Sequence, residues 1–178
     1  MIQLEEKLIK IKAFIFDIDG VLSCDTQQLD VDGVPIRTTN VKDGYAIHNA
    51  INMGYQVAII TGGFSKNVPL RYKRLTVPPE NIYIDVQDKL APFNDFLKKT
   101  KLNKEEVLYM GDDLIDHKIM KEVGFPTCPA DAVDEIKKIS LYITKKNGGR
   151  GCAREVIEMV MKAQNKWINI NSYYWRSE

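Results

Sequence analysis

Short apolar segments alternate along this chain with segments that have the period of an amphipathic helix. The apolar segments are predicted to be strands, and they cover residues 12–16, 56–60, 81–84, 107–110, 127–128 and 141–144. Most of them are apolar at successive positions, which is typical of strands buried on both faces of a parallel sheet. The segments between them place apolar residues on one helical face, as Leu90, Phe93 and Leu97 do. The alternation predicts an α/β fold with a doubly wound parallel sheet.

The length of the chain favours one domain. Its 178 residues can enclose a substantial core, and we expect a single domain over residues 1–178. Residues 25–40 interrupt the alternation, because an Asp32-Gly33 turn signal lies between two short strand-like stretches. We expect this segment to be a β-hairpin that projects from the sheet. The polar and aromatic tail, residues 169–178, is expected either to fray or to dock on a neighbouring molecule.

Composition restricts the partners and the location that we expect. Hydrophobic residues make up 44% of the chain, charged residues 28%, and the formal net charge is +1. This balance provides no broad positive field, so neither nucleic acid nor a membrane surface is an expected partner. No apolar run approaches the roughly 20 residues that span a bilayer, and the N-terminus lacks a signal-peptide pattern. The widely spaced cysteines indicate neither a disulfide framework nor a zinc site. We therefore expect a cytoplasmic protein.

Acidic and small polar residues come directly after three of the predicted strands. Asp17 and Asp19 follow the first strand, Thr61 and Gly62 follow the second, and Asp112 follows the fourth. In a parallel sheet the carboxyl ends of the strands meet at one edge, where such sheets bind ligands. Clustered carboxylates repel one another unless a hard cation neutralises them, and oxygen ligands without nearby His or Cys favour Mg²⁺. The pattern predicts a Mg²⁺ site at this edge.

The same residues are suited to phosphoryl transfer. Of the two carboxylates Asp17 and Asp19, one can attack phosphorus and the other can act as general acid and then base. Thr61 offers a hydroxyl group, Gly62 offers a backbone amide to a phosphate oxygen, and Lys89 offers a cation. Each feature alone also fits a plain turn or a solvent-exposed lysine. Their order and their placement after strands agree with one another, and this agreement favours an active site.

The motifs FDIDGV, TGG and GDDLID, together with the isolated Lys89, resemble the four motifs of the haloacid dehalogenase superfamily. The resemblance implies a core of Rossmann-like topology. It also implies that Asp17 is a nucleophile that forms an aspartyl-phosphate. Asp19 resembles the residue that protonates the leaving alcohol and then activates water, and its presence favours a phosphatase.

The same resemblance assigns the remaining site residues. It implies three Mg²⁺ ligands, namely the carboxylates of Asp17 and Asp112 and the backbone carbonyl of Asp19. It implies that Thr61 and Lys89 bind the phosphoryl group. Two further residues are expected to support the site, in part through water: Asp113 and Asp116.

A narrower similarity covers residues 10–165. The runs NVKDGYAIHNAINMGYQVAIITGG, GDDLID and GGRGCAREV are similar to the 3-deoxy-D-manno-octulosonate 8-phosphate phosphatases. This similarity implies a phosphorylated keto sugar acid as substrate, with free Kdo for lipopolysaccharide as product. It also implies a homotetramer in which the hairpins assemble, and a fold without a large cap domain. The short interval between Gly20 and Thr61 agrees with the missing cap.

Recognition of the sugar acid is where the chain departs from this family. Many relatives carry a charged residue directly after the TG of the second motif, where this chain has Gly63. Lys66 and Arg71 are candidates to replace that charge, and Arg150 is expected in a mobile basic loop near the substrate. A nine-carbon nonulosonate 9-phosphate is therefore an open alternative substrate. A catalytically silent Mg²⁺-binding scaffold is the alternative of another class, and the intact motifs argue against it.

Overall fold

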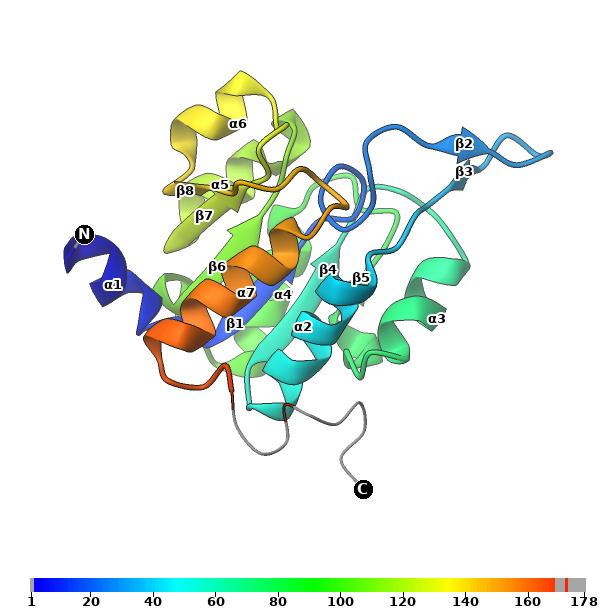
Figure 1. Ribbon diagram of the computed structural model, residues 1–178. Helices are drawn as coiled ribbons and strands as arrows, with labels where there is room; N and C mark the ends of the chain where they lie inside the picture. The colour runs from blue at the N-terminus through cyan, green and yellow to red at the C-terminus, as the bar shows by residue number, and fades with distance from the viewer. Residues whose placement is uncertain (1, 169–171, 173–178) are drawn as a thin grey trace.

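The computed structural model describes residues 2–168 and 172, and it has the predicted α/β architecture (Figure 1). Its six-stranded sheet has the order β5-β4-β1-β6-β7-β8, and every neighbouring pair is parallel. The strands are β1 (Ala13–Phe16), β4 (Gln56–Ile60), β5 (Ile82–Tyr83), β6 (Val107–Met110), β7 (Phe125–Cys128) and β8 (Tyr142–Ile143). Each coincides with a predicted strand to within two residues, so the expected doubly wound parallel sheet is confirmed.

Helices connect the strands. They are α1 (Ile2–Leu8), α2 (Val41–Asn52), α3 (Asn67–Lys73), α4 (Leu90–Thr100), α5 (His117–Glu122), α6 (Asp134–Ile139) and α7 (Cys152–Ala163). Short 3₁₀ helices are also present, namely η1 (Pro79–Asn81), η2 (Lys104–Glu106) and η3 (Leu114–Asp116). The sequence did not indicate α6, because Ile136 is its only buried residue and one apolar position makes no periodic stripe.

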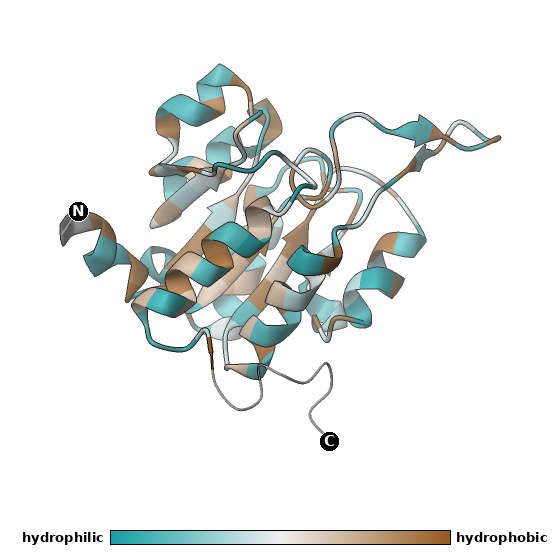
Figure 2. Ribbon diagram, viewed as in Figure 1, coloured by the Kyte–Doolittle hydropathy of each residue, from teal (hydrophilic) through white to brown (hydrophobic). Residues whose placement is uncertain are grey.

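The sheet separates two hydrophobic cores. Phe14 and Phe16 of β1 belong to the core under α2 and α7, whereas Ala13 and Ile15 belong to the core under α4 and α5. In Figure 1, α2 and α7 lie side by side over one face of the sheet. The strands are mostly hydrophobic in Figure 2, and the helices show hydrophilic outer faces. Because both faces of the sheet are covered, apolar residues at successive strand positions are all buried.

The expected hairpin projects from the carboxyl edge of the sheet (Figure 1). Its strands, β2 (Gln28–Leu29) and β3 (Pro35–Ile36), are antiparallel. Gly33 in the connecting turn has a φ of 76°, which glycine adopts without strain. Between β1 and β4 the chain forms only this hairpin and α2, so the fold carries no large cap domain.

The order of the strands also creates a crevice. From the central β1 the chain moves first to β4 on one side and later to β6 on the other side. The helix before β4, α2, and the helix before β6, α4, lie on opposite faces of the sheet. This separates the loops at the carboxyl ends of β1, β4 and β6. Ligands bind open α/β sheets at such points, so this crevice is where site residues are to be sought.

Two sequence expectations concern other parts of the chain. Across the described residues, no helix combines the length and apolar character needed to cross a membrane. The aromatic tail, residues 169–178, lies outside the described residues except for Ser172. The carbonyl of Ser172 accepts a hydrogen bond from the Tyr45 hydroxyl of α2.

Candidate active site

One cavity of about 310 Å³ opens at the carboxyl edge of the sheet. Asp17 directly follows β1 and Asp19 comes two residues later, Thr61 directly follows β4, and Asp112 comes two residues after Met110, where β6 ends. The other predicted site residues that line it are Gly62, Lys89 and Asp113. The fold therefore brings together the residues predicted for nucleophilic attack, acid–base chemistry, phosphate binding and metal binding.

Lys89 is the buried cation of the cavity. It directly precedes α4 and is only 2% exposed, which excludes a solvent-exposed surface lysine. Its ammonium nitrogen lies 2.8 Å from Asp17 Oδ2 and 2.6 Å from Asp116 Oδ1. Burial acts to lower the pKa of Lys89, but the two carboxylates outweigh it and raise the pKa above its ordinary value. A permanent positive charge therefore lies beside Asp17.

Asp116 holds this arrangement in place. Its Oδ1 accepts hydrogen bonds from Lys89 at 2.6 Å and from the buried Tyr109 hydroxyl at 2.5 Å. Its Oδ2 accepts from the backbone amide of Asp112 at 3.0 Å. A Cβ at Gly111 would lie 2.3 Å from the Asp116 carboxyl carbon, so glycine is needed where this carboxylate meets the loop. Asp116 contacts Lys89 directly, without an intervening water, and its oxygens are occupied by donors.

Asp112 lacks such partners. Its buried Oδ1 has no hydrogen-bond partner among the described residues, although carboxylate oxygens of Asp17, Asp112 and Asp116 lie within 4.8 Å of one another. Burial, followed by repulsion from Asp17 and Asp116, raises the pKa of Asp112 to about 8. Burial and Asp116 raise the pKa of Asp17 to about 7 despite the opposing effect of Lys89. Uncompensated carboxylates of this kind fit a divalent cation.

A glycine allows the two loops of the site to meet. Gly20 has a φ of 82°, and a Cβ there would lie 1.9 Å from Asp112 Oδ2. Any other residue would push the loop after β1 away from the loop after β6. The geometry of the Asp17–Asp112 pair thus depends on this close backbone approach.

Asp19 has a partner that the sequence did not indicate. Arg37, just after β3 of the hairpin, donates from Nε to Asp19 Oδ1 at 2.8 Å and from Nη2 to Asp19 Oδ2 at 2.7 Å. A Cβ at Gly63 would lie only 2.3 Å from Arg37 Nη2. The guanidinium group therefore occupies the space beside Gly63, where Lys66 and Arg71 were the expected cations. Only the return path of the hairpin places Arg37 there, and no local pattern signals it.

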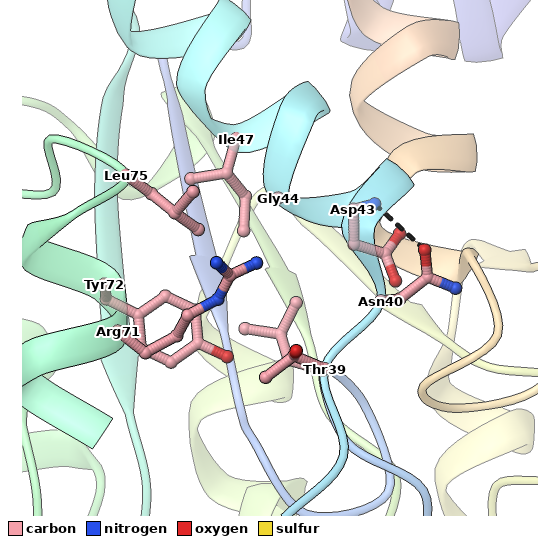
Figure 3. Close-up of a pocket in the computed structure, with 9 residues that line it drawn as sticks. Thr39, Asn40, Asp43, Gly44, Ile47, Arg71, Tyr72 and Leu75 are labelled. Atoms are coloured by element: carbon pink, nitrogen blue, oxygen red, sulfur yellow. Dashed lines mark hydrogen bonds between the residues drawn. The ribbon is translucent and has the colours of Figure 1, made fainter. Parts of the chain in front are cut away.

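The fold does not bring the three predicted sugar-acid residues to this cavity. Lys66 is exposed at the start of α3. Arg71 lines a neighbouring pocket, where Figure 3 shows its guanidinium group directed toward α2, and a Cβ at Gly44 would lie 2.7 Å from its Nη2. Arg150 is exposed and shares a separate hollow with Arg154. Their roles in substrate binding stay predictions.

The GGRG segment, which is predicted to be a mobile loop, packs closely at its first two residues. Gly148 and Gly149 are buried, and the Gly149 amide donates to the Val21 carbonyl at 2.7 Å. A Cβ at Gly148 would lie 1.8 Å from the Gly20 carbonyl oxygen. The two glycines pack backbone against backbone on the loop after β1, and this close contact is the reason that the segment is held.

Comparisons with known proteins agree with this geometry. A family model described as haloacid dehalogenase-like hydrolase matches residues 80–156. The 3-deoxy-D-manno-octulosonate 8-phosphate phosphatase of Escherichia coli K12 is 38% identical over 156 residues, which cover 88% of this chain and 82% of that protein.

Solved structures show the same relationship. The Yersinia pestis 3-deoxy-D-manno-octulosonate 8-phosphate phosphatase has a TM-score of 0.87 and 34% identity, covering 91% of this chain and 86% of that one. The Moraxella catarrhalis enzyme of the same name, solved with a magnesium ion, a phosphate ion and a KDO molecule, also has a TM-score of 0.87 and 34% identity, covering 93% and 94%. The chain therefore belongs to the haloacid dehalogenase-like hydrolases, in the family of the 3-deoxy-D-manno-octulosonate 8-phosphate phosphatases.

Proposed function

We propose that this protein is a Mg²⁺-dependent phosphatase that converts 3-deoxy-D-manno-octulosonate 8-phosphate to Kdo and inorganic phosphate. One observation carries the proposal: Asp17, Asp19, Thr61, Lys89 and Asp112 converge on a single cavity at the carboxyl edge of the sheet. The set contains a nucleophile, an acid–base group, two phosphate-binding groups and a metal ligand. The names of the relatives support the choice of substrate.

The reaction follows from the positions of these groups. A carboxylate oxygen of Asp17 forms a bond to phosphorus while the ester P–O bond breaks, and Asp19 gives a proton to the leaving alkoxide. Water then attacks the aspartyl-phosphate, Asp19 takes its proton, and Asp17 and inorganic phosphate are released. Lys89 and Thr61 bind the phosphoryl oxygens throughout, in positions that are already fixed by burial.

The carboxylates of Asp17 and Asp112, with the backbone carbonyl of Asp19, would hold the metal ion. Bound Mg²⁺ would neutralise charge that develops on the phosphoryl group. The unpaired, buried Oδ1 of Asp112 supports this assignment. Asp116 is a poorer ligand because Lys89, Tyr109 and a backbone amide already occupy its oxygens.

The proposed metal site predicts an unusual dependence of stability on pH. Without metal, the protein should lose stability as the pH rises from about 4 to about 8. The folded pKa values of Asp17 and Asp112, about 7 and about 8, lie above the ordinary 3.8, so the folded state binds more protons than the unfolded chain in this window. Mg²⁺ should reverse this loss, and thermal melts at pH 5 and pH 8, with chelator and with Mg²⁺, measure it.

Asp112→Asn should flatten the pH dependence of the metal-free protein and abolish most of the rise in Tm on adding Mg²⁺ at pH 8. Asp32→Asn, which removes an exposed carboxylate in the hairpin turn, is the matched control and should behave like the wild type. An equal response to Mg²⁺ in Asp112→Asn and the wild type would remove Asp112 from the metal site.

Phosphate release from a panel of sugar phosphates, with Mg²⁺ and with chelator, tests the function itself. Strong Mg²⁺-dependent selectivity for the eight-carbon keto acid phosphate is the expected result. Preference for a nine-carbon nonulosonate 9-phosphate would keep the mechanism and replace the substrate. Absence of Mg²⁺-dependent release from every ester would favour the silent scaffold.

We further propose that the protein assembles into a homotetramer through its hairpin. Leu29, Val31 and Ile36 are 63%, 101% and 52% exposed, which is unusual for aliphatic side chains so close together. Sedimentation velocity should give the tetramer mass for the wild type and a smaller species for Val31→Asp. A wild type that sediments as a monomer at micromolar concentration would contradict the assembly.

A further inference from the structure

The Asp19 carboxylate, the proposed acid–base group, is hydrogen-bonded to residues of the hairpin segment. Asp19 Oδ1 accepts from Arg37 Nε at 2.8 Å and from Gln27 Nε2 at 2.7 Å, while Oδ2 accepts from Arg37 Nη2 at 2.7 Å. Both oxygens therefore face donors of the hairpin segment. Three hydrogen bonds from this segment therefore bind and orient the carboxyl group, and only Oδ2 keeps a lone pair for another partner. Loss of this contact would leave Asp19 freer to turn toward a leaving group or a water molecule.

The two hairpin residues that bind Asp19 do not have all of their own hydrogen bonds satisfied. Arg37 Nη1 and Gln27 Oε1 are buried, and neither has a hydrogen-bond partner in the described structure. Unpaired buried polar atoms are unfavourable and mark places where a ligand can complete the bonding. Asp19 uses the Nε–Nη2 edge of the guanidinium group, so the Nη1–Nη2 edge keeps two unused N–H donors, one on each nitrogen. A second carboxylate fits that edge with two parallel hydrogen bonds.

The guanidinium group also lies at the right place to meet a substrate. Gly63 lines the phosphoryl cavity, and its missing Cβ leaves the space that Arg37 Nη2 fills. Arg37 also lines an adjacent hollow of about 170 Å³, together with Ser65 and Asn67. Arg37 therefore lies between the cavity that holds Lys89 and a second hollow whose walls are partly polar and partly apolar. A phosphate ester bound in the first cavity has this cation directly behind Asp19 and Gly63, which line the cavity.

We propose that Arg37 is the specificity-determining residue that binds the substrate's carboxylate and, by doing so, releases Asp19 for catalysis. Because Nη1 is buried, the guanidinium group has to turn to present this edge to the incoming carboxylate, and the turn separates Nε and Nη2 from Asp19. Arg37 thereby links recognition of the substrate's carboxylate to the availability of Asp19 for proton transfer. This inference rests on the proposed function, because it assigns roles to Asp19 and to a sugar acid substrate.

The linkage predicts opposite effects on two kinds of ester. Arg37→Gln should reduce kcat/KM for 3-deoxy-D-manno-octulosonate 8-phosphate by about 100-fold, mainly through KM, since the carboxylate loses its bidentate partner. The same variant should raise kcat for arabinose 5-phosphate by roughly threefold, because this ester has no carboxylate and cannot free Asp19 in the wild type. Arg37→Lys should recover only part of the loss, since an ammonium group has no planar fork.

Steady-state kinetics of the full chain with Mg²⁺ on these two esters tests the proposal. Arg74→Gln is the matched control, because it removes an exposed arginine at the end of α3 and should leave both esters unchanged. Equal losses on both esters in Arg37→Gln, or no change on either, would overturn the role of Arg37 and leave the proposed function intact. A wild type that hydrolyses only the ester without a carboxylate would overturn both.

Discussion

Asp17→Asn should lower the rate of phosphate release by at least about 10⁴-fold, while the protein keeps its fold. An amide cannot attack phosphorus to form the acyl phosphate, and no other carboxylate replaces it. Asp116 is fixed by Lys89 and Tyr109, and Asp19 is held by Arg37. Stability should change little, because asparagine has nearly the same shape and the substitution removes one of the repelling carboxylates.

The covalent intermediate provides the sharper measurement for Asp17. Rapid acid quench of the wild type with ³²P-labelled substrate should leave label on the protein, and Asp17→Asn should carry none. Asp88→Asn is the control, because this exposed carboxylate directly precedes Lys89 and takes no part in the cavity. Labelled protein in Asp17→Asn, or a rate near that of the wild type, would assign the nucleophile to another residue.

Lys89→Met should have the largest combined effect on stability and activity. The ammonium group lies 2.8 Å from Asp17 and 2.6 Å from Asp116, so its removal leaves two buried carboxylates without their counter-charge. Breaking a buried pair in this way costs about 3–5 kcal/mol of unfolding free energy. The variant should also lose phosphatase activity, because the transferring group loses a preorganised cation.

The loss in Lys89→Met should be greater at pH 8 than at pH 5. In the variant the carboxylates can relieve their repulsion by binding protons, and they do so more readily at the lower pH. Denaturant unfolding with chelator at both pH values measures the difference, and Lys98→Met on the exposed face of α4 is the control. A loss below about 1 kcal/mol at pH 8 would mean that water solvates these carboxylates.

Much of the fold and of the catalytic set was predictable because it depends on local patterns. A strand buried on both faces is apolar at successive residues, and β4 and β6 have the bounds that this pattern predicts. Residues that directly follow parallel strands must meet at one edge, so Asp17, Thr61 and Asp112 were placed before any coordinates were known. The family resemblance implied the missing cap, and the short interval before β4 agrees with it.

What escaped prediction depends on contacts between segments far apart in the chain. The burial of Lys89 and its pairing with Asp116 depend on how the start of α4 meets the loop after β6. The contact of Gly149 with Val21 joins residues separated by most of the chain. No periodicity records such a contact, since it arises only when both segments have packed on the same sheet.

The position of Arg37 likewise depends partly on a local sequence pattern and partly on tertiary contacts. The sequence determined that a hairpin separates Asp19 from α2, because a turn signal lies between two short strand-like stretches. Only the tertiary structure decided that the returning strand carries an arginine back to Asp19 and into the space left by Gly63. The physical reason is that local propensity sets the turn, whereas the path of the hairpin over the sheet sets which side chains meet.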